Sequence, residues 1–219
     1  RATLDRVPGR GALLKRIGEL GDAVPARVSG VQVNGTHYYY LKRLAAENVP
    51  RLYLRTGLNG KERLLIDPQA VTRASGVHFA IDYYAPSFDN KYLAYGVSPG
   101  GSEESVLRVI EVATGKETGE AIDRAQFGPP SWTDDNRLIY NRLAKLAPDA
   151  PQSEKYLRSR AYIHPIGSDP ERDRAVLGAG VVSDMALDPL ATPVVFTSPG
   201  APYVIGIIGN GNQREFSLY

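Results

Sequence analysis

One serine of the chain lies in a Gly-x-Ser-x-Gly pattern, Gly96-Val97-Ser98-Pro99-Gly100. In hydrolases this pattern forms a sharp strand-to-helix turn, and the backbone N–H after the serine helps to bind the oxyanion of the reacting carbonyl. Here that residue is Pro99, which has no N–H to donate. The residues from Val106 onward also alternate as in a strand and do not follow a helical pattern. Ser98 is therefore predicted to lie in a hairpin loop at the edge of a blade and not to act as a nucleophile.

The other reactive side chains form no recognisable catalytic or metal-binding pattern. His37, His78 and His164 lack the spacing of a metal site, so structural or surface roles are expected for them. The chain has no cysteine, which excludes a thiol nucleophile, a disulfide and a thiolate metal site. Glycine clusters begin at Gly178 and Gly206 but lack the context of a dinucleotide fingerprint. The sequence thus predicts no catalytic residue, no metal and no cofactor.

Composition narrows the classes of partner. The 219 residues are 42% apolar, and 26 basic against 24 acidic side chains give a net charge of +2. This near balance makes nucleic acid and anionic membrane surfaces poor partners. No apolar run reaches the length of a membrane-spanning helix. The absence of cysteine fits a cytoplasmic or a periplasmic location equally well.

The elements that would position any site come from a repeated phrase. PSFDNKYLAY at 86–95 returns as PSWTDDNRLIY at 130–140, with Ser87 matched to Ser131. Both copies read as a strand end, a tight Asp/Asn turn and a strand rich in aromatic and apolar residues. Looser copies stand at 31–40 and 195–205.

Each copy is followed by a second strand pair or the start of one, so the repeating unit has four short strands. This is the signature of a β-propeller blade. The inner strands of a blade pack on both faces, so Tyr95, Trp132 and Tyr140 are expected in the core between blades. Four-stranded antiparallel blades are predicted near residues 31–67, 81–122, 128–178 and 194–219.

Two segments fall outside the repeat. Residues 4–20 place four apolar side chains at helical spacing and predict an amphipathic helix confined to about residues 9–20. Residues 142–159 are rich in alanine, proline and polar residues and are expected to form an exposed excursion within the third blade. The helical side chains are Leu13, Leu14, Ile17 and Leu20.

In this order the segments resemble the amino-terminal part of the prolyl oligopeptidase family of serine peptidases. The resemblance rests on LDRVPGRGALLKRIGEL before the first blade and on THYYYLKRLAAENVPRLYLRTGLNGKERLLIDP as the first blade. It continues through APSFDNKYLAYGVSPGGSEESVLRVIEVATGKE, FGPPSWTDDNRLIYNRL and TSPGAPYVIGII, and covers nearly the whole chain.

The resemblance implies an all-β fold of about four of seven propeller blades, preceded by a short amphipathic helix. Residues 1–27 would form the helical segment that packs on an α/β-hydrolase domain, and residues 28–219 a partial propeller with a truncated fourth blade. The serine, aspartate and histidine of the hydrolase would lie beyond Tyr219. The implied partners are that domain, in the same parent chain, and short proline-containing peptides that the propeller gates and selects.

One site residue follows from the resemblance. The family places an aromatic residue shortly before the tryptophan of the third blade, where it helps to hold the substrate residue two before the proline. In RAQFGPPSW that residue is Phe127. The poor strand formers Gly128, Pro129 and Pro130 favour a connection that lets the side chain point into a cavity. The alternative is that Phe127 belongs to the core between blades.

Two other interpretations of the whole chain remain open. A free-standing small propeller that binds a partner is physically possible, because four blades can close. A propeller glycosidase would need two carboxylates that converge on the central channel. Most carboxylates stand in turns, among them Asp89, Asp134 and Asp135, where they would bond to local backbone.

Overall fold

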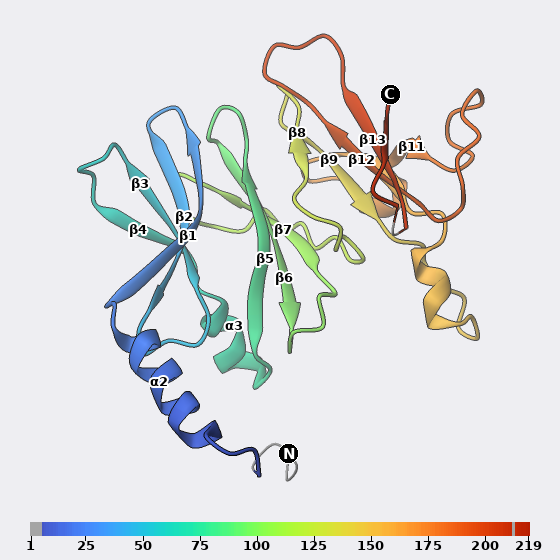
Figure 1. Cartoon of the computed structure of the whole chain (residues 1–219). Coiled ribbons are helices and arrows are strands. Elements are labelled where there is room, and N and C mark those ends of the chain that lie inside the picture. The colour runs from blue at the N-terminus through green and yellow to red at the C-terminus, as the bar shows by residue number, and fades with distance from the viewer. Residues whose placement is uncertain (1–5, 212) are drawn as a thin grey trace. The chain divides into compact units, whose positions relative to one another are not determined.

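The computed structural model describes residues 6–211 and 213–219, so the first five residues of the predicted helical segment lie outside the described residues. The chain folds almost entirely as antiparallel strands, arranged in four sheets with few helices. It divides into two compact units, residues 1–67 and 68–219. Figure 1 shows one sheet in the first unit and three in the second.

The first unit holds one helix and one four-stranded sheet. Helix α2 (Arg10–Asp22) confirms the predicted helix, and its apolar residues Leu13, Leu14, Ile17 and Leu20 are all exposed. The sheet has the strand order β1-β2-β3-β4. Its strands are β1 (Ala26–Asn34), β2 (His37–Leu44), β3 (Arg51–Thr56) and β4 (Glu62–Ile66).

The second unit holds three sheets, with the orders β5-β6-β7, β11-β10-β9-β8 and β12-β13-β14. They are called the second, third and last sheets below. Their strands are β5 (Phe79–Pro86), β6 (Tyr92–Pro99), β7 (Val106–Glu111), β8 (Ser131–Trp132), β9 (Arg137–Arg142), β10 (Arg160–Pro165), β11 (Arg174–Gly178), β12 (Ala191–Phe196), β13 (Ile205–Asn210) and β14 (Phe216–Leu218). Two 3₁₀ turns, η1 (Gln152–Tyr156) and η2 (Pro170–Arg172), lie in its connections.

Two details differ from the expected four-stranded blades. In the second sheet the fourth strand is reduced to two isolated bridges, Leu107 with Ile122 and Ile110 with Glu117. The last sheet has three strands within the described residues.

The prediction that helix is confined to residues 9–20 was wrong, because helix α3 (Pro68–Ser75) precedes β5. Its signals are present in the sequence. Proline at the first helical position after Asp67 favours a helix start. At the other end Gly76 takes the left-handed φ of +73° and closes the last turn with its N–H on Thr72 O, 2.8 Å away.

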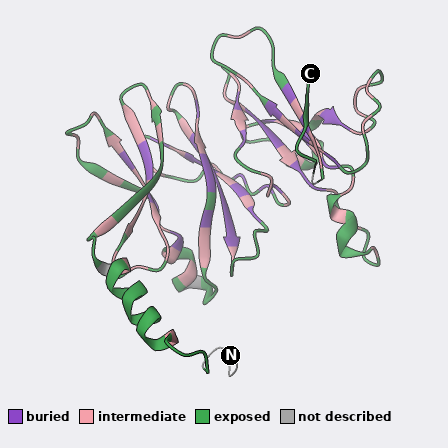
Figure 2. Cartoon of the chain, viewed as in Figure 1, coloured by how far each residue is buried: buried purple, intermediate pink, exposed green. Residues whose placement is uncertain are grey.

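The core of the second unit depends on strands buried on both faces. Along β9, Leu138 packs in the cluster shared with the second sheet, and the next residue, Ile139, packs in the cluster shared with the last sheet. Alternate residues of a strand point to opposite faces, so both neighbours must be apolar. Figure 2 shows the buried residues of the second unit along the strands of its sheets, with β6 and β9 among the most buried.

The three aromatic residues predicted to be core are buried, and each has a partner for its polar atom. Trp132 donates from Nε1 to Ala85 O of the second sheet at 2.9 Å. The hydroxyl of Tyr95 donates to Glu117 and that of Tyr140 to Asp173, both at 2.7 Å. Aromatic side chains can therefore fill the spaces between sheets without leaving a polar atom unpaired.

The repeated phrase builds the same turn twice. Ser87 Oγ accepts the N–H of Tyr92, and Thr133 Oγ1 accepts that of Arg137, both at 2.9 Å. Both hydroxyls also donate to the aspartate two residues on, Asp89 or Asp135. The structural equivalent of Ser87 is thus Thr133 and not Ser131, because what repeats is a hydroxyl at the turn start, whichever residue carries it.

Trp132→Ala is expected to lower the free energy of unfolding by about 3–5 kcal/mol, because it leaves a cavity between two sheets and removes the hydrogen bond to Ala85 O. Urea unfolding followed by circular dichroism measures this loss. The exposed Tyr203 provides a control, since Tyr203→Ala should change the value by no more than about 0.5 kcal/mol. A loss below about 1 kcal/mol for Trp132→Ala would contradict this account of the core.

Candidate functional site

The prediction that Ser98 lies in a hairpin loop at the edge of a blade was wrong, because this residue is part of strand β6. It is 1% exposed near the end of β6, opposite Ala80 of β5. Its Oγ donates to Asp82 Oδ1 at 2.9 Å, and Ser105 donates to the other oxygen of the same carboxylate. The next regular element is strand β7 and not a helix. The Ser98 hydroxyl therefore holds strands together, and no histidine is bonded to it.

A serine-directed phosphonate is expected to leave Ser98 unlabelled, because the hydroxyl is buried and its proton is held by Asp82. Intact-mass spectrometry of the 219-residue chain after incubation tests this. Ser98→Ala provides the control, and its only expected effect is a stability loss of about 0.5–1.5 kcal/mol. A phosphonate adduct on the chain that disappears in Ser98→Ala would show that the serine is reactive.

Of the three histidines only His164 is fully buried, and it joins two sheets. Its Nδ1 lies 3.0 Å from both carboxylate oxygens of Asp173, and its Nε2 lies 4.0 Å from Glu120 Oε1. Tyr140 donates to Asp173 as well, and the hydroxyl of Ser168 lies 3.4 Å from Nδ1. Two carboxylates thus face one imidazole inside the molecule.

These contacts shift the pKa values of both His164 and Glu120. Burial alone would lower the pKa of His164, but the carboxylates of Glu120 and Asp173 outweigh it and raise that pKa above its usual value. Burial would raise the pKa of Glu120, but the His164 imidazole 4.0 Å away and the hydrogen bonds donated by Thr118 and the backbone N–H of Gly167 lower it to about 2.

The stability of the second unit should depend on pH through this pair. The raised His164 pKa contributes stability below about pH 6.5, its unfolded value, and this is lost as pH rises through the folded pKa. The lowered Glu120 pKa contributes stability above about pH 4.3, lost as pH falls toward 2. The contribution is therefore greatest between about pH 4.3 and 6.5.

Urea unfolding at pH 5.5 and 8.5, together with the NMR titration of the His164 ring, measures this effect. His164→Gln should remove most of the difference between the two pH values, whereas the exposed His78→Gln should keep it. A His164 titration midpoint below about 6.5 would contradict the assignment.

The part of the chain that the structure describes contains neither a metal-binding cluster nor a membrane-spanning helix. No group of three or more histidine, cysteine, aspartate or glutamate side chains among these residues could hold a metal ion. No helix there is both long and apolar enough to cross a membrane.

Phe127 lies in the connection between the second and third sheets. The connection turns at Gly128, whose φ of +97° is left-handed, and two prolines lead it into β8. The side chain is half-buried, and it belongs to neither of the two buried clusters described above. Its ring instead lies 6.2 Å from that of Tyr156, centre to centre, at an interplanar angle of 50°.

A hollow of about 360 Å³ is lined by residues that neighbour this pair in the chain, and neither of the two rings is part of its lining. Gln126 and Lys155, the chain neighbours of Phe127 and Tyr156, both line it. The lining combines apolar side chains with charged and amide groups: Glu104, Asp123, Arg124, Gln126, Leu143, Ala144, Leu146, Gln152 and Lys155. The predicted excursion at 142–159 therefore forms one wall of a depression, a role that its alanine- and proline-rich composition does not indicate.

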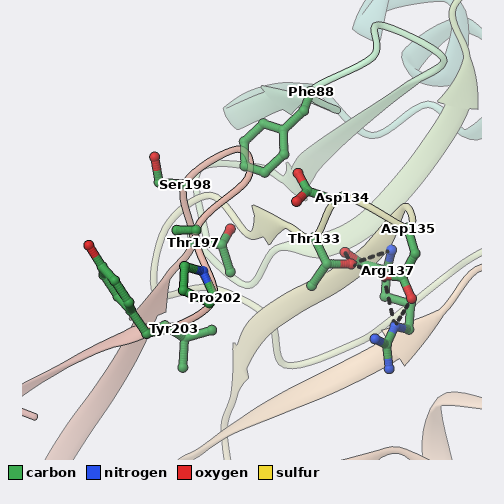
Figure 3. Close-up of a pocket in the computed structure, with 11 residues that line it drawn as sticks. Phe88, Thr133, Asp134, Asp135, Arg137, Thr197, Ser198, Pro202 and Tyr203 are labelled. Atoms are coloured by element: carbon green, nitrogen blue, oxygen red, sulfur yellow. Dashed lines mark hydrogen bonds and ion pairs between the residues drawn. The ribbon is translucent and has the colours of Figure 1, made fainter.

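A second hollow, of about 480 Å³, lies at the other end of the sheets, among the hairpin turns (Figure 3). Phe88, Thr133 and Tyr203 come from three different sheets or their turns and line it together. Its carboxylates already have partners, since Asp135 pairs with Arg137 at 2.9 Å and Asp134 accepts the N–H of Gly200 at 3.0 Å. The first contact lies within one turn and the second joins two turns, so both have a structural role.

The successive antiparallel sheets define a class of fold, the β-propeller. The family model described as prolyl oligopeptidase, N-terminal beta-propeller domain, matches residues 2–181. The chain belongs to this family, and its antiparallel sheets are propeller blades.

Particular relatives agree with this assignment. The prolyl endopeptidase of Elizabethkingia miricola is 23% identical over 177 residues, which cover 80% of this chain and 24% of that protein. A structure from a study of two prolyl endopeptidases and their inter-domain dynamics is 25% identical, with a TM-score of 0.81, over 100% of this chain and 32% of that one. Prolyl oligopeptidase B from Galerina marginata, bound to a 35mer substrate, shares the fold at 15% identity, with a TM-score of 0.78 over 99% of this chain and 31% of that one. The chain thus spans about a quarter to a third of the length of these relatives.

Proposed function

We propose that this chain is the propeller portion of a longer serine peptidase, in which it gates and selects short proline-containing peptides for a hydrolase domain. The family match over residues 2–181 carries the proposal. The relatives are three to four times as long as the part that matches, which favours the longer enzyme over a free-standing binding module. Bond cleavage would belong to the hydrolase domain, since Ser98 is buried and engaged.

The helix supports the proposed partner. In α2 all four apolar side chains at helical spacing are between 50% and 61% exposed. Burying them would contribute about 1.5–3 kcal/mol each, which is a strong drive for another surface to cover them. We therefore propose residues 1–27 as the segment that packs on the hydrolase domain, and residues 28–219 as the part that faces the peptide.

Phe127 is the residue that we propose contacts the peptide. It stands in a connection at the end of the sheets opposite the tight turns, half-buried beside a hollow. Connections on a rigid β-scaffold are where binding residues concentrate, because their side chains are free of the packing that fixes the strands.

In the longer enzyme, Phe127→Ala is expected to lower kcat/KM for peptides with a bulky residue two before the proline by about 1–3 kcal/mol, the energy of a lost apolar contact. Peptides with glycine at that position should be affected less. The free energy of unfolding should change by less than about 1 kcal/mol, because the ring lies outside the two clusters.

Phe88→Ala is the matched control. It removes the same ring from a turn at the other end of the sheets, so it should leave the preference between the two peptides unchanged. A stability loss of about 3–5 kcal/mol for Phe127→Ala, without a change in preference, would instead place Phe127 in the core.

A further inference from the structure

Tyr156 is brought against Phe127 by a segment that the sequence leaves without a pattern. The two residues belong to different connections, one before β8 and one between β9 and β10. Their ring centres are 6.2 Å apart, inside the range in which aromatic pairs attract each other. The ring of Tyr156 is 41% exposed, so its contact with Phe127 does not come from burial in the core.

Several bonds fix the position of Tyr156. The 3₁₀ turn η1 closes with Leu157 N donating to Glu154 O at 3.0 Å. The N–H of Ala144 donates to Lys155 O at 3.2 Å, which ties the turn to the chain that leaves β9. The Lys155 ammonium pairs with Glu104 Oε1 of the second sheet's connection at 2.8 Å.

The same lysine links the segment to the ring itself. Lys155 Nζ lies 5.3 Å from the centre of the Tyr156 ring, within the range of a cation–π contact. The segment is thus held by the carbonyl of Lys155, by the ammonium of Lys155 and by the contact of that ammonium with the Tyr156 ring, although most of the segment is exposed. An exposed tyrosine would otherwise sample several rotamers, and ordering it costs conformational entropy.

We propose that Tyr156 is a positioning residue that holds the Phe127 ring, next in the chain to Gln126 of the 360 Å³ hollow, so that a bulky apolar side chain of the peptide is received between this ring and the hollow. This deepens the proposed function and rests on it. Leu143, Ala144 and Leu146 supply apolar lining for such a side chain. The pairs Lys155 with Glu104 and Arg124 with Asp123 satisfy most of the charge around it.

The ring contact can be tested first on the 219-residue chain itself. Phe127 ring signals in NMR spectra should shift in Tyr156→Ala, because the neighbouring ring current is lost. They should stay close to the wild-type position in Tyr156→Phe, which keeps the ring. Tyr203→Ala removes another exposed tyrosine, from the other end of the sheets, and should not move them. Unchanged Phe127 signals in Tyr156→Ala would overturn the proposal.

The effect on specificity is tested in the longer enzyme with two peptides, carrying phenylalanine or glycine two before the proline. Tyr156→Ala should lower the ratio of their kcat/KM values about 3- to 10-fold, mainly through KM, and Tyr156→Phe by less than about twofold. Leu146→Trp, which fills the hollow, should lower the same ratio without touching either ring.

The outcomes distinguish the positioning role of Tyr156 from the peptide contact of Phe127. If Phe127→Ala lowers the ratio and Tyr156→Ala and Leu146→Trp do not, the role of Tyr156 is wrong and the proposed contact of Phe127 stands. If none of the three variants changes the ratio, the peptide contact itself is wrong. A loss of folding in Tyr156→Ala, with the ratio preserved in Tyr156→Phe and Leu146→Trp, would make the tyrosine structural and overturn the proposal.

Discussion

Burial of the inner strands on both faces is the constraint on which the second unit depends. A sheet that packs between two others has no solvent side, so consecutive residues such as Leu138 and Ile139 must both be apolar. Tyrosine and tryptophan side chains fill the wide spaces between twisted sheets, but each has a polar atom that must be hydrogen-bonded. The bond from Trp132 to Ala85 satisfies that need and joins the second and third sheets at the same place.

The two ends of the sheets in the second unit differ in structure. One end stabilises the fold, and the other carries the residues that we propose contact the peptide. At one end neighbouring turns are bonded to one another, as when Asn136 Nδ2 donates to Asp89 Oδ2 at 2.8 Å. At the other end the connections are long and irregular, and they leave Phe127 and Tyr156 partly exposed beside a hollow. A rigid end holds the strands in register, so the irregular end can vary without loss of the fold.

Buried ionisable groups also stabilise the packing of the sheets in the second unit. His164 is surrounded by carboxylates from its own sheet and from the end of the second sheet, so its charge binds the two together while they remain ionised. This arrangement links packing to pH, since a buried pair is favourable only when both members carry their charges. The Ser98 hydroxyl is similarly engaged with Asp82, which explains why a nucleophile-like sequence pattern has a structural role.

The sequence by itself determined the repeat, the strand positions, the amino-terminal helix and the family, because these follow from local patterns of apolar residues and turns. Even helix α3 was marked by Pro68 and Gly76. Only the tertiary structure decided that Thr133 and not Ser131 is the equivalent of Ser87, that His164 lies between Asp173 and Glu120, and that Tyr156 meets Phe127. Those contacts join residues far apart in the chain, and the spacing of residues along a sequence carries no information about which irregular connections fold against each other.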